Sequence, residues 1–344
     1  MRERESSDQS NAAGDSNLCE ACGGSDFRVI IGNLVHKYSH DNLPATWKYS
    51  LIRCNYCGMV FVTPQPSSMI LETFYREDYC CYTDALDPAQ ESQSLKYRIA
   101  RGRFATHRKK SVTANLEMIL GVLVEILTGR SVSYTLGIPL QLALDAQIFD
   151  LGFGTGSWLL GMRHIGYTNL HGYDISSNGK NVERLMSLGI NVSTGDFLRN
   201  YYPDDYFDLI RLEHVFEHLL KPKDVLARVH RMLKPGGLLV LNFPSSEAIS
   251  FLLSPRHYAN RDSPRHLFLH TKRSAQKMLI SAGFDRISSR TYAVGLDLEA
   301  TFNNMLKSSK LNVKLRFGSM IASLYKILGH LFKCGENITI MAVK

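Results

Sequence analysis

Short apolar runs alternate with longer amphipathic stretches through the second half of the chain. The runs are IFDL at 148–151, LHGYD at 170–174, INVST at 190–194, FDLIRLE at 207–213 and GLLVLNFP at 237–244. Each run has the length of a buried strand, and the stretches between them have helical spacing. Strands that alternate with helices over short connections predict an α/β fold with a doubly wound, mostly parallel sheet.

Two later segments extend this pattern. FDRISSRTY at 284–292 and NITIMAVK at 337–344 indicate a sixth and a seventh strand, and the residues between them, about 298–333, indicate a helical insertion. Residues 67–146 are mainly helical by the same spacing and would form a linker and cap. The α/β domain is therefore expected at 147–344.

The composition fits a globular enzyme with one large domain and smaller appendages. Of the 344 residues, 44% are hydrophobic and 21% are charged, so the chain can bury a sizeable core. The formal net charge of +8 would favour polyanions as partners. The basic residues are scattered, however, apart from RGRFATHRKK at 101–110, which fits a solvated helix face.

The first residues, 1–16, are polar and predict a disordered tail, with no hydrophobic segment of a secretory signal behind them. No apolar run is long and charge-free enough to cross a bilayer. A cytoplasmic location is therefore expected. The segment 306–333, where apolar residues follow several lysines, could lie on a membrane surface, but a core-facing helix is the preferred interpretation.

Two C-x-x-C pairs lie near the start of the chain. Cys19 and Cys22 form the first pair and Cys54 and Cys57 the second, and a glycine follows each pair. Two thiolates spaced in this way can reach one tetrahedral ion, so the two pairs predict a four-cysteine zinc site that is structural, because no coordination position stays open. Flanking β-like stretches indicate a zinc ribbon over 17–66. Paired redox cysteines are the alternative.

The strongest chemical signal is IFDLGFGTGSWLLG, in which an apolar run is followed by a glycine-rich turn and a helix start. Glycines at 152, 154 and 156 let the backbone turn sharply and approach a ligand, as in nucleotide-type cofactor loops. The dinucleotide fingerprint would have a glycine where Ser157 stands. Acidic residues end the next two strand regions: Asp174, which suits ribose hydroxyls, and Asp196, which would contact an adenine edge.

The order of the motifs D-L-G-F-G-T-G, G-Y-D, G-D-F, E-H and L-K-P-G-G resembles that of class I S-adenosylmethionine-dependent methyltransferases over about residues 146–293. The resemblance implies a Rossmann-like sheet of seven strands, with the last strand antiparallel beside the sixth. It also implies that the glycine loop cradles the methionine part of the cofactor. Phe153 departs from the pattern and would narrow the loop. The cofactor-binding residues that the resemblance implies are Asp150, Gly152, Gly154, Gly156, Asp174, Asp196 and Phe197.

The pentapeptide HVFEH at 214–218 has the H-x-x-E-H spelling of a zinc protease helix. Such a protease needs both histidines on one long helix, whereas a proline follows closely here. In the methyltransferase resemblance this segment follows the fourth strand and forms a wall of the methyl-acceptor pocket. His214, Glu217 and His218 are therefore candidates for orienting or deprotonating the acceptor. In the alternative, Glu217 and His218 only join the loop to a neighbouring helix.

DSPRHL at 262–267 narrows the resemblance. It looks like the D-x-P-R-H-L signature of zinc-ribbon-bearing methyltransferases encoded with polysaccharide and sugar-modifying enzymes. That subgroup implies Arg265 and His266 in the roof of the active site, with His266 as a further candidate base and Tyr258 as a substrate-binding residue. Arginine pairs well with phosphate, so Arg265 would suit a sugar nucleotide. A structural role in closing a turn is the alternative.

Three hypotheses about function follow. The leading one is a methyltransferase that acts on a hydroxyl, or a carbon, of a small-molecule or glycan-linked acceptor. The second is a zinc-ribbon RNA-binding protein whose methyltransferase domain modifies nucleic acid or is inactive. Few basic residues in the ribbon, and RLEH where a base-methylating enzyme would show N-P-P-Y, argue against nucleic acid as a partner. The third is a homologue that binds the cofactor without turnover.

Overall fold

The computed structural model describes most of the predicted ribbon and most of the predicted α/β domain. Most of the predicted cap at 67–146, the tail at 1–16 and much of the segment 306–333 lie outside the residues it describes. The described residues are 18–35, 48–66, 71, 74, 137–139, 141–309, 313–316, 324, 325, 328, 329 and 332–344.

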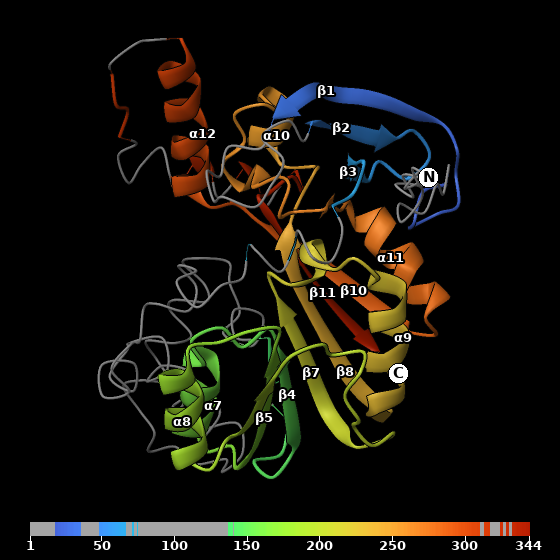
Figure 1. Ribbon diagram of the computed structural model, residues 1–344, viewed down its shortest axis with the longest axis vertical. Helices are drawn as coiled ribbons and strands as arrows, with labels where there is room; N and C mark the ends of the chain where they lie inside the picture. Colours follow the sequence, from blue (N-terminus) through green and yellow to red (C-terminus); the bar gives the residue numbers. More distant parts are fainter. Residues whose placement is uncertain are drawn as a thin grey trace, which may run out of the picture.

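A seven-stranded sheet forms the centre of the molecule, in the strand order β10-β11-β8-β7-β4-β5-β6 (Figure 1). The pairs from β8 through β6 are parallel. β11 runs antiparallel to both of its neighbours. The predicted mostly parallel sheet and its antiparallel last strand are therefore confirmed. The strands are Gln147–Leu151 (β4), Asn169–Asp174 (β5), Asn191–Thr194 (β6), Phe207–Glu213 (β7), Leu233–Pro244 (β8), Asp285–Tyr292 (β10) and Asn337–Val343 (β11).

Helices cover both faces of this sheet, with α7 and α8 on one face and α9 and α11 on the other (Figure 1). Successive residues of a strand point to opposite faces. In β4, Ile148 accordingly packs in the apolar layer with α7, whereas Phe149 packs in the layer with α9 and α11. The central sheet thus lies between two apolar layers. The helices are Ser157–Ile165 (α7), Gly179–Ser187 (α8), Pro222–Met232 (α9) and Lys272–Ser281 (α11).

A second sheet of four antiparallel strands, in the order β1-β2-β3-β9, includes the predicted ribbon. Its first three strands come from the predicted range 17–66, but β9 follows His266 almost directly in the chain. The ribbon therefore takes its fourth strand from the methyltransferase part of the sequence, beyond the boundary predicted for it. The strands are Phe27–Val35 (β1), Lys48–Cys54 (β2), Val60–Thr63 (β3) and Phe268–Leu269 (β9).

Short helical elements complete the region between the two sheets and beside it. α12 is a helix at the start of the predicted insertion, and it packs near α10 and η2. These elements are Phe216–His218 (η1), Ile249–Leu253 (α10), Ala259–Arg261 (η2) and Gly295–Ser308 (α12).

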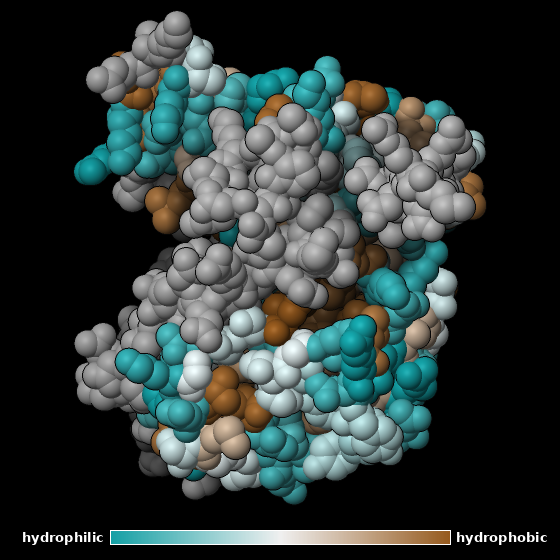
Figure 2. All heavy atoms as spheres, in the orientation of Figure 1, coloured by the Kyte–Doolittle hydropathy of each residue, from teal (hydrophilic) through white to brown (hydrophobic). Residues whose placement is uncertain are grey.

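The face of the molecule in Figure 2 is mostly hydrophilic over the described residues, with hydrophobic residues in separate groups. Among the described residues, no helix combines the length and the apolar composition that a membrane span requires. The large apolar side chains pack mainly on the two faces of the central sheet.

Candidate active site

The glycine-rich loop joins β4 to α7 at the carboxyl edge of the central sheet. Gly152, Gly154 and Gly156 have φ angles of 84°, 56° and 81°, in the region that other residues rarely adopt. A side chain on Gly152 would also overlap Val215. Gly156 begins α7 without a side-chain cap, which leaves the positive end of the helix dipole for a ligand.

Asp174 ends β5 next to this loop. The Gly154 N–H donates a hydrogen bond of 2.8 Å to Asp174 Oδ2, and the Ser176 N–H lies 3.4 Å from Oδ1. Asp174 is buried, so these contacts orient its carboxylate at the loop. The position suits the predicted ribose ligand, and the role itself stays a prediction.

Asp150 lies in β4, within the core of the central sheet. It is buried, and its Oδ1 accepts a 2.8 Å hydrogen bond from Arg211. The guanidinium of Arg211 in turn lies 4.4 Å over the ring of Trp158. Burial raises the pKa of the Asp150 carboxyl, while Arg211 opposes that effect. The carboxylate thus has an internal partner, which makes support of the loop the role that the geometry favours.

Asp196 and Phe197, which follow β6, differ in accessibility. The Asp196 side chain is 53% exposed and pairs with Arg199 at 3.0 Å. Phe197 is buried and packs against the rings of Phe149 and Tyr173. Asp196 is therefore accessible to a ligand, whereas most of Phe197 belongs to the core of the sheet.

HVFEH forms a tight turn after β7. His214 has a φ of 53°, and the 3-10 helix that follows, η1, is three residues long. The His214 N–H donates to the Asn242 carbonyl at 2.8 Å. The turn lacks the long helix that an H-x-x-E-H protease requires. It also packs Val215 against Gly152. The turn that carries His214, Glu217 and His218 therefore lies beside the glycine loop.

Glu217 is fully buried and orients His214. The Nδ1 of His214 lies 3.2 Å from Glu217 Oε1. Because a carboxylate only accepts hydrogen bonds, the His214 proton is on Nδ1 and the lone pair is on Nε2. Burial alone would lower the pKa of His214, but the hydrogen bond to Glu217 and its charge raise it. The His214 side chain is 46% exposed, against 0% for Glu217, so the imidazole is the part of this pair that a substrate can reach.

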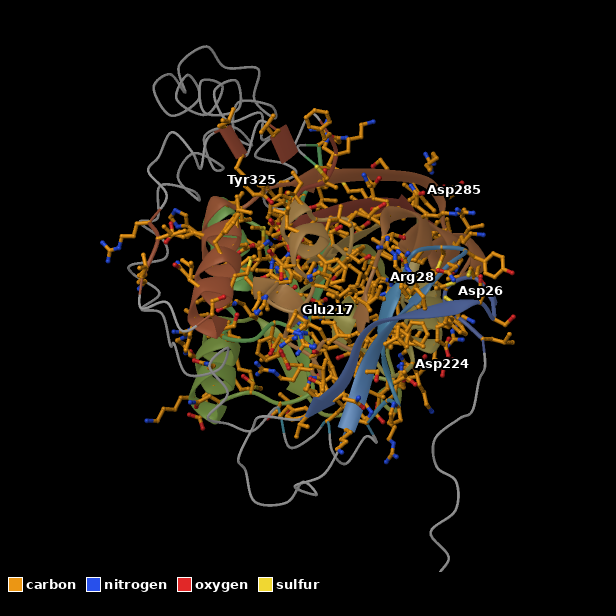
Figure 3. The ribbon with its side chains drawn as sticks, turned by 90° about the horizontal axis from the view of Figure 1, so that it is seen from above. Asp26, Arg28, Glu217, Asp224, Asp285 and Tyr325 are labelled. Atoms are coloured by element: carbon orange, nitrogen blue, oxygen red, sulfur yellow. The ribbon has the colours of Figure 1, made fainter. Side chains whose placement is uncertain are left out.

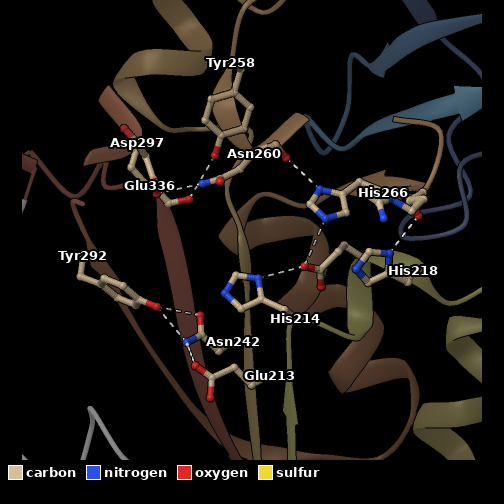
Figure 4. A network of polar contacts seen from close by, with 12 residues as sticks. Glu213, His214, His218, Asn242, Tyr258, Asn260, His266, Tyr292, Asp297 and Glu336 are labelled. Atoms are coloured by element: carbon tan, nitrogen blue, oxygen red, sulfur yellow. Dashed lines mark hydrogen bonds and ion pairs between the residues drawn. The ribbon is translucent and has the colours of Figure 1, made fainter. Parts of the chain in front are cut away.

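Two more histidines surround Glu217. His266 Nε2 lies 3.9 Å from Glu217 Oε1, and the rings of His218 and His266 pack edge to face with centroids 4.6 Å apart. Burial would raise the pKa of Glu217, but the His214 hydrogen bond and the electrostatic effect of the surrounding histidines lower it to about 2. Burial and the neighbouring His266 lower the pKa of His218 to about 4. All four predicted catalytic side chains are thus brought together, with His214 the most exposed (Figure 4).

Arg265 and Tyr258 make internal contacts. Arg265 pairs with Asp262 at 2.8 Å within one turn, and its carbonyl accepts a 3.0 Å hydrogen bond from His218 Nδ1. Tyr258 is buried, and its hydroxyl donates to the Glu336 carbonyl at 3.2 Å. The geometry favours the turn-closing alternative for Arg265. Substrate binding by these two residues stays a prediction.

Sequence reasoning missed several polar residues near His214. Asn242 donates to the Tyr292 hydroxyl at 2.8 Å, and Asn260 donates to Asp297 Oδ2 at 3.0 Å. Figure 4 shows these pairs on either side of His214. Asn242 and Tyr292 could have been predicted from the sequence, because they are polar residues near the ends of predicted strands, at the edge of the sheet where ligands bind. The other pair lies in an irregular segment and a helix start, which carry no such signal.

The four predicted metal-binding cysteines also come together. Their sulfur atoms all lie within 4.8 Å of one another. Cys19 and Cys57 are 3.5 Å apart, and Cys22 and Cys54 are 3.6 Å apart. Tetrahedral zinc with bonds of about 2.3 Å holds its sulfurs about 3.8 Å apart. The cluster therefore has the donor set and the dimensions of a four-cysteine zinc site.

Comparison with known proteins connects this geometry to a family. A family model described as a methyltransferase domain matches residues 130–289. The ubiquinone/menaquinone biosynthesis C-methyltransferase UbiE of Pseudomonas fluorescens is 26% identical over 177 residues, which cover 44% of this chain and 69% of that protein. The protein of the same name from Stutzerimonas stutzeri is 32% identical over 114 residues, which cover 28% and 44%. The chain thus spans roughly half to two thirds of these relatives.

Solved structures of methyltransferases are similar at low identity. Phosphoethanolamine N-methyltransferase 2 of Haemonchus contortus, in complex with S-adenosyl-L-methionine, has a TM-score of 0.44 and 15% identity, over 83% of this chain and 62% of that one. A methyltransferase of Thermotoga maritima has a TM-score of 0.41 and 13% identity, over 72% and 99%. The family match over residues 130–289 and the curated relatives, together with the glycine loop, show that the chain contains an S-adenosylmethionine-dependent methyltransferase domain, and the sheet of this domain extends to Val343.

Proposed function

We propose that this enzyme transfers the methyl group of S-adenosylmethionine to a hydroxyl of a small-molecule or glycan-linked acceptor. The observation that carries the proposal is the pair of His214 and Glu217, which the contact of Val215 with Gly152 sets beside the glycine loop. An accessible base at that position is what methylation of a hydroxyl needs. The left-handed backbone of His214 is the kind of local strain that clusters at functional sites.

The glycine loop, Asp174 and Asp196 are the proposed cofactor ligands. The loop offers backbone N–H groups and the amino end of α7, the buried Asp174 offers an oriented carboxylate, and Asp196 offers an accessible one. S-adenosylmethionine, when bound, supplies an electrophilic methyl group on a sulfonium. The chain itself has to hold the acceptor in line and exclude water, which accounts for much of the rate in such displacements.

His214 is the proposed general base. Its Nδ1–H is held by Glu217, so Nε2 can accept the proton of the acceptor hydroxyl. Glu217 then stabilises the imidazolium, in the way that the carboxylate of a hydrolase triad does. A proton acceptor in this position typically raises the rate of the reaction by about 10²–10⁴-fold.

We assign the cysteine cluster to a structural zinc ion. The sulfur distances support this assignment, as do the two tight turns after the cysteines, where Gly23 and Gly58 have φ angles of 69° and 78°. The ribbon contacts the active-site roof through β9 and through the Tyr49 hydroxyl, which donates to the Ser263 carbonyl at 2.8 Å. The zinc would therefore hold the segment that carries His266.

A carbon acceptor is the second candidate, because the curated relatives are named as C-methyltransferases. The same base could remove a proton from an acidic carbon. The experiment that tests the proposal is transfer of isotopically labelled methyl groups to a panel of sugar nucleotides, glycans and phenols, read by mass spectrometry. We expect product with the wild-type chain and with His230→Gln, and a strong loss with His214→Gln. Equal product with both variants would remove His214 from its proposed role.

A further inference from the structure

We infer that Glu217, His218 and His266 form a second metal site, for a divalent transition-metal ion such as Zn²⁺, Fe²⁺ or Co²⁺. Each of the three residues offers one ligand atom, and these atoms all lie within 4.8 Å of one another. Two imidazoles and one carboxylate are the ligand set of many three-ligand sites for such ions. Glu217 is fully buried, and its label lies near the centre of the view in Figure 3.

The hydrogen bonds around the three side chains are those that metal ligands usually have. His218 Nδ1 donates to the Arg265 carbonyl at 3.0 Å, and His266 Nδ1 donates to the Asn260 carbonyl at 2.8 Å. A carbonyl only accepts, so both rings carry their proton on Nδ1 and their lone pair on Nε2. Histidines that bind metals typically donate their second nitrogen to a backbone carbonyl in this way.

The carboxylate of Glu217 gives an independent indication. Its Oε1 accepts the hydrogen bond from His214, but its Oε2 is buried and has no hydrogen-bond partner among the residues that the structure describes. A buried oxygen of an ionised carboxylate without a partner is costly. A cation held by Oε2 and by the two Nε2 atoms would remove that cost. His214 would then contact the carboxylate from outside the coordination sphere, as such carboxylates commonly require.

The inferred site differs from the cysteine cluster in chemistry and in function. Four thiolates fill the coordination sphere of a tetrahedral ion, whereas three protein ligands leave one coordination position open for water or for an oxygen of the acceptor. The site lies beside His214, and the turn that carries His214 and Glu217 contacts the glycine loop through Val215. A metal there could polarise an acceptor oxygen. Metal binding itself rests on the three side chains and not on the proposed methyl transfer.

The test is the Co²⁺ content and absorption spectrum of the full chain after removal of its metals and reloading with Co²⁺. Cobalt bound to thiolates and cobalt bound to nitrogen and oxygen give distinct spectra, so the two sites are read separately. We expect wild type and His230→Gln to bind one more Co²⁺ per chain than His266→Ala and Glu217→Gln, with the thiolate bands equal in all four. His230 lies at the far end of α9, and its variant is the matched control.

Equal Co²⁺ content in wild type and both site variants would overturn the inference. It would also be overturned if the ion lost in the variants were the thiolate-bound one. Glu217→Gln keeps the size of the side chain, so it decides the question if His266→Ala does not fold. Binding of S-adenosylmethionine, measured by calorimetry on the same samples, separates a failure of this site from a failure of the proposed function.

Discussion

At the scale of single residues, Glu217 determines the protonation of the histidines around it. With its pKa lowered to about 2, its carboxylate is ionised at neutral pH. That charge raises the pKa of His214, whereas burial keeps His218 neutral. Neighbouring imidazoles therefore differ in chemistry because they differ in exposure and in their contact with one carboxylate. The arrangement favours His214 as the base and His218 as a group that stays uncharged.

Replacement of His214 tests this difference. We expect His214→Gln to lower kcat by about 10²–10⁴-fold, because no base would remain at the acceptor hydroxyl. Affinity for S-adenosylmethionine should change little, since the glycine loop and Asp174 are untouched. Single-turnover kinetics and calorimetry measure the two quantities separately. A variant that retains full kcat would show that the acceptor needs no base at this position.

At the scale of elements, the turn from β4 into α7 depends on glycine. Gly156 has a φ of 81°, and a side chain there would overlap Leu185 of α8. We expect Gly156→Ala to lower the free energy of unfolding by about 1–3 kcal/mol and to weaken cofactor binding, because α7 and α8 must shift. Chemical denaturation and calorimetry measure these effects.

Gly179→Ala is the matched control for this prediction. Gly179 begins α8, has ordinary backbone angles and has open space around its Cα. Alanine there should be neutral or should stabilise the helix by about 0.5–1 kcal/mol. If both alanine variants behaved alike, the loop conformation described above would be wrong.

The second element with a testable role is the ribbon sheet. β3 pairs with β9, and the Thr271 hydroxyl at the start of α11 donates to the Cys57 carbonyl at 2.7 Å. Loss of the proposed zinc should therefore loosen both the ribbon and the roof that carries His266. We expect Cys54→Ser to remove one thiolate-bound metal per chain and to lower the free energy of unfolding by at least about 2 kcal/mol. Cys334→Ser, outside the cluster, should leave the metal content unchanged.

At the scale of the whole molecule, one buried carboxyl couples pH to stability. Glu336, at the start of β11, accepts a 2.6 Å hydrogen bond from Ser250 of α10 and another from Tyr325. Burial, with a smaller effect of Asp297, raises its pKa from 4.5 to about 7. A pKa that is higher in the folded state means that the folded chain binds the proton more tightly. Stability from this group is therefore complete below pH 4.5 and is lost as the pH rises through 7.

Glu336→Gln tests that coupling. The wild-type chain should lose on the order of 1–3 kcal/mol of unfolding free energy from this group between pH 5 and pH 8. The glutamine variant should lose less over the same interval, because its side chain does not titrate. Urea denaturation at a series of pH values measures the difference. Identical pH dependence in the two chains would assign the effect to other groups.

Sequence patterns predicted the central sheet because its order follows from short strands, helical connections and a glycine loop, all of which are local. The clustering of the four cysteines was predictable because each C-x-x-C pair is itself a local motif of metal sites. The pairing of β9 with the ribbon was not, because a two-residue strand has no periodicity. The internal partner of Asp150 was also missed, since Arg211 lies on another strand and only the register brings the two together.

The central claim is that the glycine loop and Asp174 bind S-adenosylmethionine, and calorimetric titration tests it most directly. The wild-type chain and Asp174→Ala would each be titrated with S-adenosylmethionine and with its demethylated product. We predict micromolar binding of both ligands by the wild type and a loss of affinity of at least about tenfold in the variant, from the missing hydrogen bonds to the ribose. Absence of binding by the folded wild-type chain, or unchanged affinity in the variant, would contradict the assignment of this site.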